Sequence, residues 1–210
     1  MQEIKDLTAY RLSLKDKIMA TALNAFMNNG IKAVKMDDIA SALSISKRTL
    51  YEIYGDKESL LFACIKRRHQ ERVDYMREYS EHHNVIEIVL EVYRRKVEEM
   101  KMVNYSFYQD IRLYPKVVEF MDQVHVNAHA QFLVFIQRGQ TEGYFRKDVN
   151  YELISMMFDS IGEYVAKERL YAQYPYEELI ANLMLVPFRG FCTSKGLKVL
   201  DVVKNEAGFN

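Results

Sequence analysis

The sequence predicts an all-α protein with a substantial buried core. Only 8 of its 210 residues are glycine and 3 are proline, so long helices are favoured over many short strands. Apolar residues recur at the three- and four-residue spacing of amphipathic helices. With 49% hydrophobic residues, the chain can form one compact helical protein or two small domains that share packed faces.

The first predicted helix covers residues 14–29. Ile18, Ala22 and Phe26 lie along one stripe of this helix, which is the pattern of a face that packs against a core. Gly30 follows directly and tolerates the left-handed backbone that ends many helices. We therefore expect the helix to bury one face and to end at Gly30.

Residues 36–54 contain two short amphipathic segments joined by a tight turn. Helical spacing relates the apolar positions Ile39, Ala40 and Leu43 in the first segment, and Leu50, Ile53 and Tyr54 in the second. In the turn, Ile45 can fill the space between the two helices. Ser46 can accept hydrogen bonds from the unpaired N–H groups that open the second helix. This arrangement predicts a helix-turn-helix.

The second of these helices carries polar residues on an exposed arc near its N-terminus. That end of a helix-turn-helix recognition helix contacts base edges and phosphates. Arg48 could form paired hydrogen bonds with guanine, and Thr49 or Tyr51 could reach a phosphate or a thymine methyl group. The alternative is that Lys47 and Arg48 are only solvated, which the complete motif makes the weaker interpretation.

A family resemblance rests on these residues. The run 30–61 resembles the N-terminal domain of TetR-family transcriptional regulators through Asp38-Ile39-Ala40, Leu43, Ser46-Lys47-Arg48-Thr49-Leu50-Tyr51 and Lys57-Glu58-Ser59-Leu60-Leu61. The run 139–146 resembles a connection between two ligand-domain helices of the same family. Three positions depart from the family pattern: Ser44 replaces a usual Gly, Lys35 replaces a Ser or Thr cap, and Arg48 replaces a small residue.

The resemblance implies a domain organisation and a set of DNA contacts. It implies a helix-turn-helix domain at residues 1–55 with a tail at 1–13, a connecting helix at 56–80, and a ligand-binding and dimerisation domain at 81–210. The expected partner is a palindromic double-stranded operator bound by a homodimer. The expected DNA-binding residues are Lys35, Ser46, Lys47, Arg48, Thr49, Tyr51 and Lys57. Of these, Lys35 is about as well explained as a solvated side chain.

The second part of the chain continues as helices. Asp56 can cap a helix over residues 57–79. Amphipathic spacing and turn residues then predict helices over 85–103, 105–114, 116–138, 151–173 and 175–195.

Aromatic residues and histidines on these helices are candidates for a ligand pocket. In the family arrangement they would surround a cavity for a small apolar or aromatic effector, and the candidates are Tyr93, Met100, Tyr105, Phe107, Tyr108, His125, His129, Phe132 and Phe158. Each aromatic or Met residue alone is better explained as core. His125 and His129 share one helix face, but no third metal ligand is evident, so we expect neither a metal nor another cofactor.

The last two predicted helices carry more apolar surface than one subunit can cover. Two helices from each partner would form a four-helix bundle, with the small residues Gly162 and Gly190 allowing close approach. The expected dimer-interface residues are Ile154, Phe158, Ile161, Gly162, Val165, Leu179, Leu183, Val186 and Phe191.

Several features limit the possible functions. The N-terminus is charged, no apolar run is long enough to span a membrane, and Cys64 and Cys192 stand alone, so we expect a cytoplasmic protein with two core cysteines. The sequence contains no nucleotide-binding loop, metal cluster or nucleophile elbow that would indicate an enzyme. The sequence therefore predicts a ligand-responsive transcriptional regulator. A repressor is favoured, but the sequence does not distinguish repression from activation. The alternatives are a helical-pocket enzyme and a binding protein without DNA function.

Overall fold

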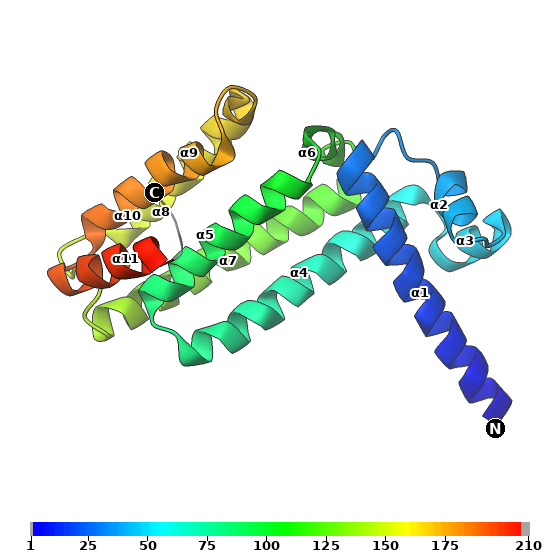
Figure 1. The fold of residues 1–210 in the computed structure, drawn as a ribbon, viewed down its shortest axis with the longest axis horizontal. Helices are drawn as coiled ribbons and strands as arrows, with labels where there is room; N and C mark the ends of the chain where they lie inside the picture. The colour runs from blue at the N-terminus through cyan, green and yellow to red at the C-terminus, as the bar shows by residue number, and fades with distance from the viewer. Residues whose placement is uncertain (1, 207–210) are drawn as a thin grey trace. The chain divides into compact units, whose positions relative to one another are not determined.

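The computed structural model describes residues 2–206. The regular secondary structure of these residues is helical (Figure 1), which confirms the all-α prediction. The α-helices are α1 Gln2–Asn29, α2 Met36–Ala42, α3 Lys47–Tyr54, α4 Lys57–His82, α5 Val85–Met102, α6 Tyr105–Ile111, α7 Pro115–Thr141, α8 Tyr151–Lys167, α9 Tyr176–Ile180, α10 Val186–Phe191 and α11 Ser194–Glu206. A 3₁₀ turn covers Leu170–Ala172, and a π-helical turn covers Ala181–Leu185. No helix in this described part combines the length and the apolar character that a membrane span requires.

The chain divides into two compact units. The N-terminal unit contains the described residues up to Asp74 together with Met102–Gln123, and the C-terminal unit contains Tyr75–Lys101 and the described residues from Val124 onward. The predicted functional boundaries at residues 55 and 80 remain predictions. Met1 and residues 207–210, which fall in the predicted tail and the predicted ligand-binding domain, lie outside the described residues.

The N-terminal unit is built around α1. Ile18 and Phe26 on this helix are fully buried, which confirms the predicted stripe, and α1 starts well before the predicted residue 14. Gly30 has a φ of +82°, as expected for a left-handed helix end. The segment that contains α6 closes this end of α1, because Asn104 N donates to Met27 O at 2.7 Å and Lys32 N donates to Asp110 Oδ2 at 2.6 Å.

The C-terminal unit is centred on Phe145, in the connection between α7 and α8. Its ring is buried, and its centroid lies 5.8 Å from those of Phe188 and Phe191. Gly139 on α7 makes room for it, since a Cβ atom at Gly139 would lie 2.1 Å from Phe145 Cδ2. This connection is where the sequence resembled a family linker, and its glycine has a direct packing role.

The last helices differ from the prediction. Instead of one helix over residues 175–195, the chain forms α9, a π-helical turn and α10, and α11 then follows unpredicted. Pro187 explains the π turn, because it lacks the N–H that would bond the Leu183 carbonyl in a regular α-helix. Gly196 allows α11 to pack closely, since a Cβ atom there would lie 2.5 Å from Tyr144 O.

Candidate functional site

The turn between α2 and α3 has the hydrogen bonding that the sequence predicted. Ser46 is the N-cap of α3, and its Oγ accepts a hydrogen bond from Thr49 N at 3.0 Å. The two hydroxyl groups of Ser46 and Thr49 also lie 2.8 Å apart. Ile45 packs against the core of the N-terminal unit. Ser44, however, has a φ of +53°, a conformation that favours glycine.

The outward arc of α3 is exposed and already engaged in surface ion pairs. Arg48 is 88% exposed, and its Nε donates to Glu52 Oε1 at 2.7 Å. Lys47 pairs with Asp37, and this hydrogen bond raises the pKa of Lys47. Tyr51 is 46% exposed beside them. These surface pairs hold the side chains weakly, so a phosphate or a base edge could displace the carboxylates.

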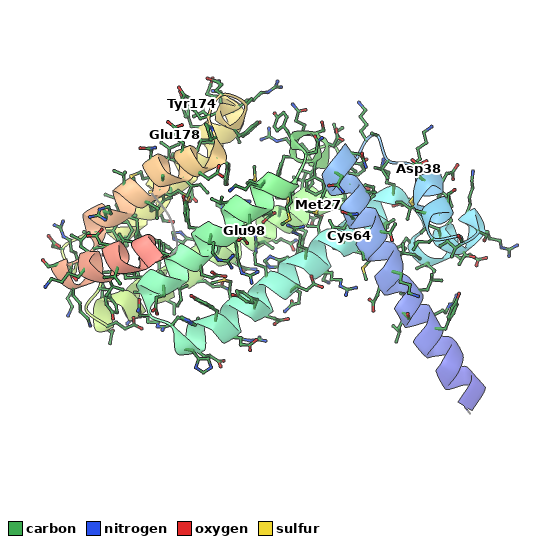
Figure 2. The ribbon with its side chains drawn as sticks, viewed as in Figure 1. Met27, Asp38, Cys64, Glu98, Tyr174 and Glu178 are labelled. Carbon is green, nitrogen blue, oxygen red and sulfur yellow. The ribbon has the colours of Figure 1, made fainter. Side chains whose placement is uncertain are left out.

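Lys35 and Lys57 have more structural environments. The backbone N–H of Lys35 donates to Asp38 Oδ2 at 2.8 Å in the first turn of α2, where Figure 2 labels Asp38. The Lys35 side chain is exposed. Lys57 is half-buried, with Nζ 3.4 Å from Lys32 O and 5.9 Å from the centroid of the Phe26 ring. Partial burial lowers the pKa of Lys57. Its ammonium is therefore more fixed than that of Lys47.

A cavity of about 610 Å³ lies within the C-terminal unit. This volume is in the range of pockets that hold small molecules. Five predicted pocket residues line it: Tyr93 from α5, His125, His129 and Phe132 from α7, and Phe158 from α8. The structure therefore brings these five side chains around one space.

Four other predicted pocket residues do not line this cavity. Phe107 is buried in the core of the N-terminal unit, and Tyr108 packs against the same core. Tyr105 lies with them on α6, while Met100 lies on α5 without lining the cavity. The physical reason is that α6 packs against α1, so its aromatic residues complete that core. The prediction of one cavity lined by all nine residues is corrected accordingly.

The sequence analysis missed most of the apolar lining and three polar residues. The missed residues are Ile88, Val89, Val92, Ala128, Gln131, Ile136, Ser155, Asp159, Ile180, Met184, Leu185, Phe188 and Phe191. Of these, Phe191 had been predicted only as a dimer-interface residue. Ser155 and Asp159 carried a usable signal, since their four-residue spacing on α8 matches that of His125 and His129 on α7.

These four polar residues form two contacts between α7 and α8, one helical turn apart. His129 Nδ1 lies 3.0 Å from Ser155 Oγ, within hydrogen-bond distance. His125 Nε2 lies 3.7 Å from Asp159 Oδ1, too far for a hydrogen bond. Ser155 is buried, whereas Asp159 and both histidines are exposed. The described residues contain no group of three or more side chains suited to hold a metal ion.

The predicted dimer surface is only partly available to a partner. Leu179 and Phe191 are buried within the subunit, so their assignment to a dimer interface is corrected. Phe158 lines the cavity, and Ile154, Ile161, Val165 and Leu183 are half-buried. Val186 is exposed, and Gly162 and Gly190 have open space where a Cβ atom would lie. Leu153, Met156 and Tyr164 on α8 add exposed apolar surface that the prediction did not include.

Both cysteines occupy core positions, as predicted. Cys64, labelled in Figure 2, donates from Sγ to Met19 O at 3.4 Å, and burial raises its pKa to about 12. Burial also raises the pKa of Cys192 to about 11. Neither thiol is activated as a nucleophile.

Comparisons with known proteins agree with the domain seen at the N-terminus. Residues 18–64 match the family model described as bacterial regulatory proteins, tetR family. The search of curated proteins finds no match.

Solved structures share the fold over nearly the whole chain. A proposed transcriptional regulator from Saccharomonospora viridis, in complex with choline, has a TM-score of 0.69 at 16% identity, covering 86% of this chain and 98% of that one. A TetR-family transcriptional regulator from Marinobacter aquaeolei VT8 has a TM-score of 0.59 at 16% identity, covering 91% and 97%. A proposed TetR-family regulator from Rhodococcus sp. has a TM-score of 0.58 at 13% identity, covering 85% and 98%.

Proposed function

We propose that this chain, which belongs to the TetR family of transcriptional regulators, is a repressor that binds a palindromic operator as a homodimer and is released by a small effector. TetR-family regulators are non-enzymatic DNA-binding proteins, which favours a regulator over the enzyme alternative. One observation carries the proposal: an exposed recognition helix and a ligand-sized cavity occur in two separate units of the same chain.

DNA recognition would divide between base reading and phosphate contact. Arg48 is the candidate for base reading, because its guanidinium is exposed at the start of α3 and can form paired hydrogen bonds with guanine. Lys57 is the candidate for a phosphate contact at the N-terminus of α4, with Lys35, Lys47 and Tyr51 as further contacts. Ser46 and Thr49 would act mainly by fixing the start of α3, since their hydroxyl groups already bond to each other.

Dimerisation would place two such recognition helices on one palindrome. A single helix-turn-helix makes few contacts, and two-fold pairing doubles them. The exposed apolar residues Leu153, Met156 and Tyr164 of α8, with Val186 of α10, supply a surface that a second copy could cover. These residues replace Leu179 and Phe191 in the proposed four-helix interface.

The effector would act through helices that belong to both units. α7 contributes His125, His129 and Phe132 to the cavity, and its first residues belong to the N-terminal unit. There, Lys116 N donates to Glu58 Oε1 on α4 at 2.9 Å. Half-sites on one face of DNA lie roughly 34 to 36 Å apart, so the dimer must hold its recognition helices at a matching separation. An effector that favours a different separation would shift the population away from the DNA-competent state.

Selection of bound fragments from random and genomic DNA tests this proposal. We expect one palindromic motif, bound by two chains, whose affinity falls when an effector is added. Equal binding to all sequences would contradict the proposal, and so would the absence of DNA binding. A monomeric mass by light scattering at micromolar concentration would contradict the homodimer.

A further inference from the structure

The polar residues that line the cavity of the C-terminal unit are concentrated on two helices. Apart from Tyr93, every polar lining residue lies on α7 or α8, and the four that approach each other are His125, His129, Ser155 and Asp159. The lining residues from α9 through α10 are all apolar: Ile180, Met184, Leu185, Phe188 and Phe191. A ligand that matches both parts of the lining would have a polar head and an apolar body.

The charge of the lining selects the kind of head group. Among the described lining residues there is no lysine or arginine, and Asp159 is the single acid. Its nearest cation-forming group, His125 Nε2, lies at 3.7 Å and gives it no hydrogen bond. Burial raises the pKa of the Tyr93 phenol, so this residue stays neutral. When the imidazoles are neutral, the only formal charge on the described lining is therefore the negative charge of Asp159.

An anionic head group is disfavoured by the same geometry. A carboxylate could bind here only beside a protonated histidine, and Asp159 would repel it from the His125 side. His129 already uses Nδ1 in its contact with Ser155. This contact leaves Nε2 as the other ring nitrogen of His129, so the case against an anion rests on its repulsion by Asp159.

Aromatic rings add a second attraction for a cation. Six Phe or Tyr rings line the cavity: Tyr93, Phe132, Phe135, Phe158, Phe188 and Phe191. Phe158 and Asp159 both line the cavity from α8. Organic ammonium groups are attracted to aromatic faces by about 0.5 to 2 kcal/mol each, and to a carboxylate by charge.

We propose that the effector is an amphiphilic organic cation, with an ammonium group at Asp159 and an apolar body against α9 and α10. This inference rests on the proposed function only in calling the ligand an effector, because its binding can be measured without DNA. The choice of an amine over a carboxylate or an alcohol follows from the single acid, from the absence of lysine and arginine among the described lining residues, and from the six aromatic rings of the lining.

Three ligands that differ only in the head group test the choice. Octyltrimethylammonium, 1-octanol and octanoate would be titrated calorimetrically into the full-length protein at about pH 8, where an imidazole is mainly neutral. We expect the ammonium compound to bind about tenfold more tightly than the alcohol, and the carboxylate to bind most weakly. Asp159→Asn should remove the preference for the ammonium compound and leave the affinity for 1-octanol unchanged.

Glu152→Gln is the matched control, because it removes an exposed carboxylate from the same helix outside the cavity lining. It should leave all three affinities unchanged. Tightest binding of octanoate, or an ammonium preference that persists in Asp159→Asn, would overturn the inference. If the ammonium compound binds as expected but operator affinity does not change, the inference stands and the proposed control of DNA binding fails.

Discussion

The N-terminal unit presents most of its candidate functional groups on an exposed helix, whereas the C-terminal unit arranges its candidate ligand contacts around a cavity. Arg48 is 88% exposed, so its truncation removes almost no packing. Phe158 and Phe191 line the cavity, and both also belong to the hydrophobic core of their unit. Substitutions should therefore separate binding from stability in the first unit and couple the two in the second.

The largest expected effect tests that coupling in the C-terminal unit. Gly139→Ala places a Cβ atom 2.1 Å from the buried Phe145 ring, which must move together with the neighbouring rings of Phe188 and Phe191. We expect a loss of about 3 kcal/mol in the free energy of unfolding, together with weaker ligand binding. Chemical denaturation and calorimetric titration measure these two effects.

Gly162→Ala is the control for this substitution, because no atom lies within 4 Å of the added Cβ. It should stabilise α8 by up to about 1 kcal/mol. Equal stability of the two variants would contradict the packing role of Gly139.

The second effect concerns the buried carboxylate of Glu91, which we expect to contribute to stability and not to ligand binding. The Glu91 carboxylate accepts hydrogen bonds from Arg94 and Arg95 at 2.8 Å and from Tyr75 at 2.9 Å. The hydrogen bonds from Arg94 are the main cause that lowers the pKa of Glu91 to about 2, against the opposing effect of burial. Because the folded pKa is below the ordinary 4.5, this stabilisation is present above about pH 4.5 and is lost as pH falls toward 2.

Glu91→Gln should therefore lower the free energy of unfolding by about 2 kcal/mol at neutral pH, with a difference that shrinks below about pH 4.5. Glu98→Gln on the same helix is the control, since Glu98 is exposed and its pair with Arg94 should be worth at most about 1 kcal/mol. Denaturation curves between acid and neutral pH measure both. A Glu91→Gln effect that is constant over this range would contradict the role of its charge.

The third effect tests whether substitutions in the N-terminal unit change binding without changing stability. Arg48→Ala should relax sequence preference by about 1 to 3 kcal/mol at one base position and leave the free energy of unfolding unchanged. Lys57→Ala should weaken all duplexes alike and lower the salt slope by about one. Competition binding at several salt concentrations distinguishes them. Identical selectivity profiles for the two variants would contradict the division between base reading and phosphate contact.

The same contrast explains how much could be predicted from the sequence. Ser46 caps α3 through an atom three residues away, so a local motif was sufficient to predict its hydrogen bond. Phe107 was misplaced because its environment depends on α6 packing against α1, a contact between distant segments that helical spacing does not contain. Phe191 was assigned to a dimer surface for a similar reason, since an apolar stripe does not show whether its own subunit covers it. The spacing of Ser155 and Asp159 matched that of the two histidines, but only the packing of α8 beside α7 showed that Asp159 approaches His125.

The smallest expected effect lies in the turn between α2 and α3. Ser44 has a φ of +53° in the position where the resemblance predicted glycine. A non-glycine residue in this conformation costs about 1 to 2 kcal/mol, and part of that is offset because glycine loses more backbone entropy on folding. Ser44→Gly should therefore stabilise the protein by about 1 kcal/mol without changing operator affinity. Ser41→Gly, within α2, is the control and should destabilise by a similar amount. A stabilised Ser44→Gly variant with altered operator affinity would show that the strain itself sets the orientation of α3, and the separation of binding from stability would then fail in this unit.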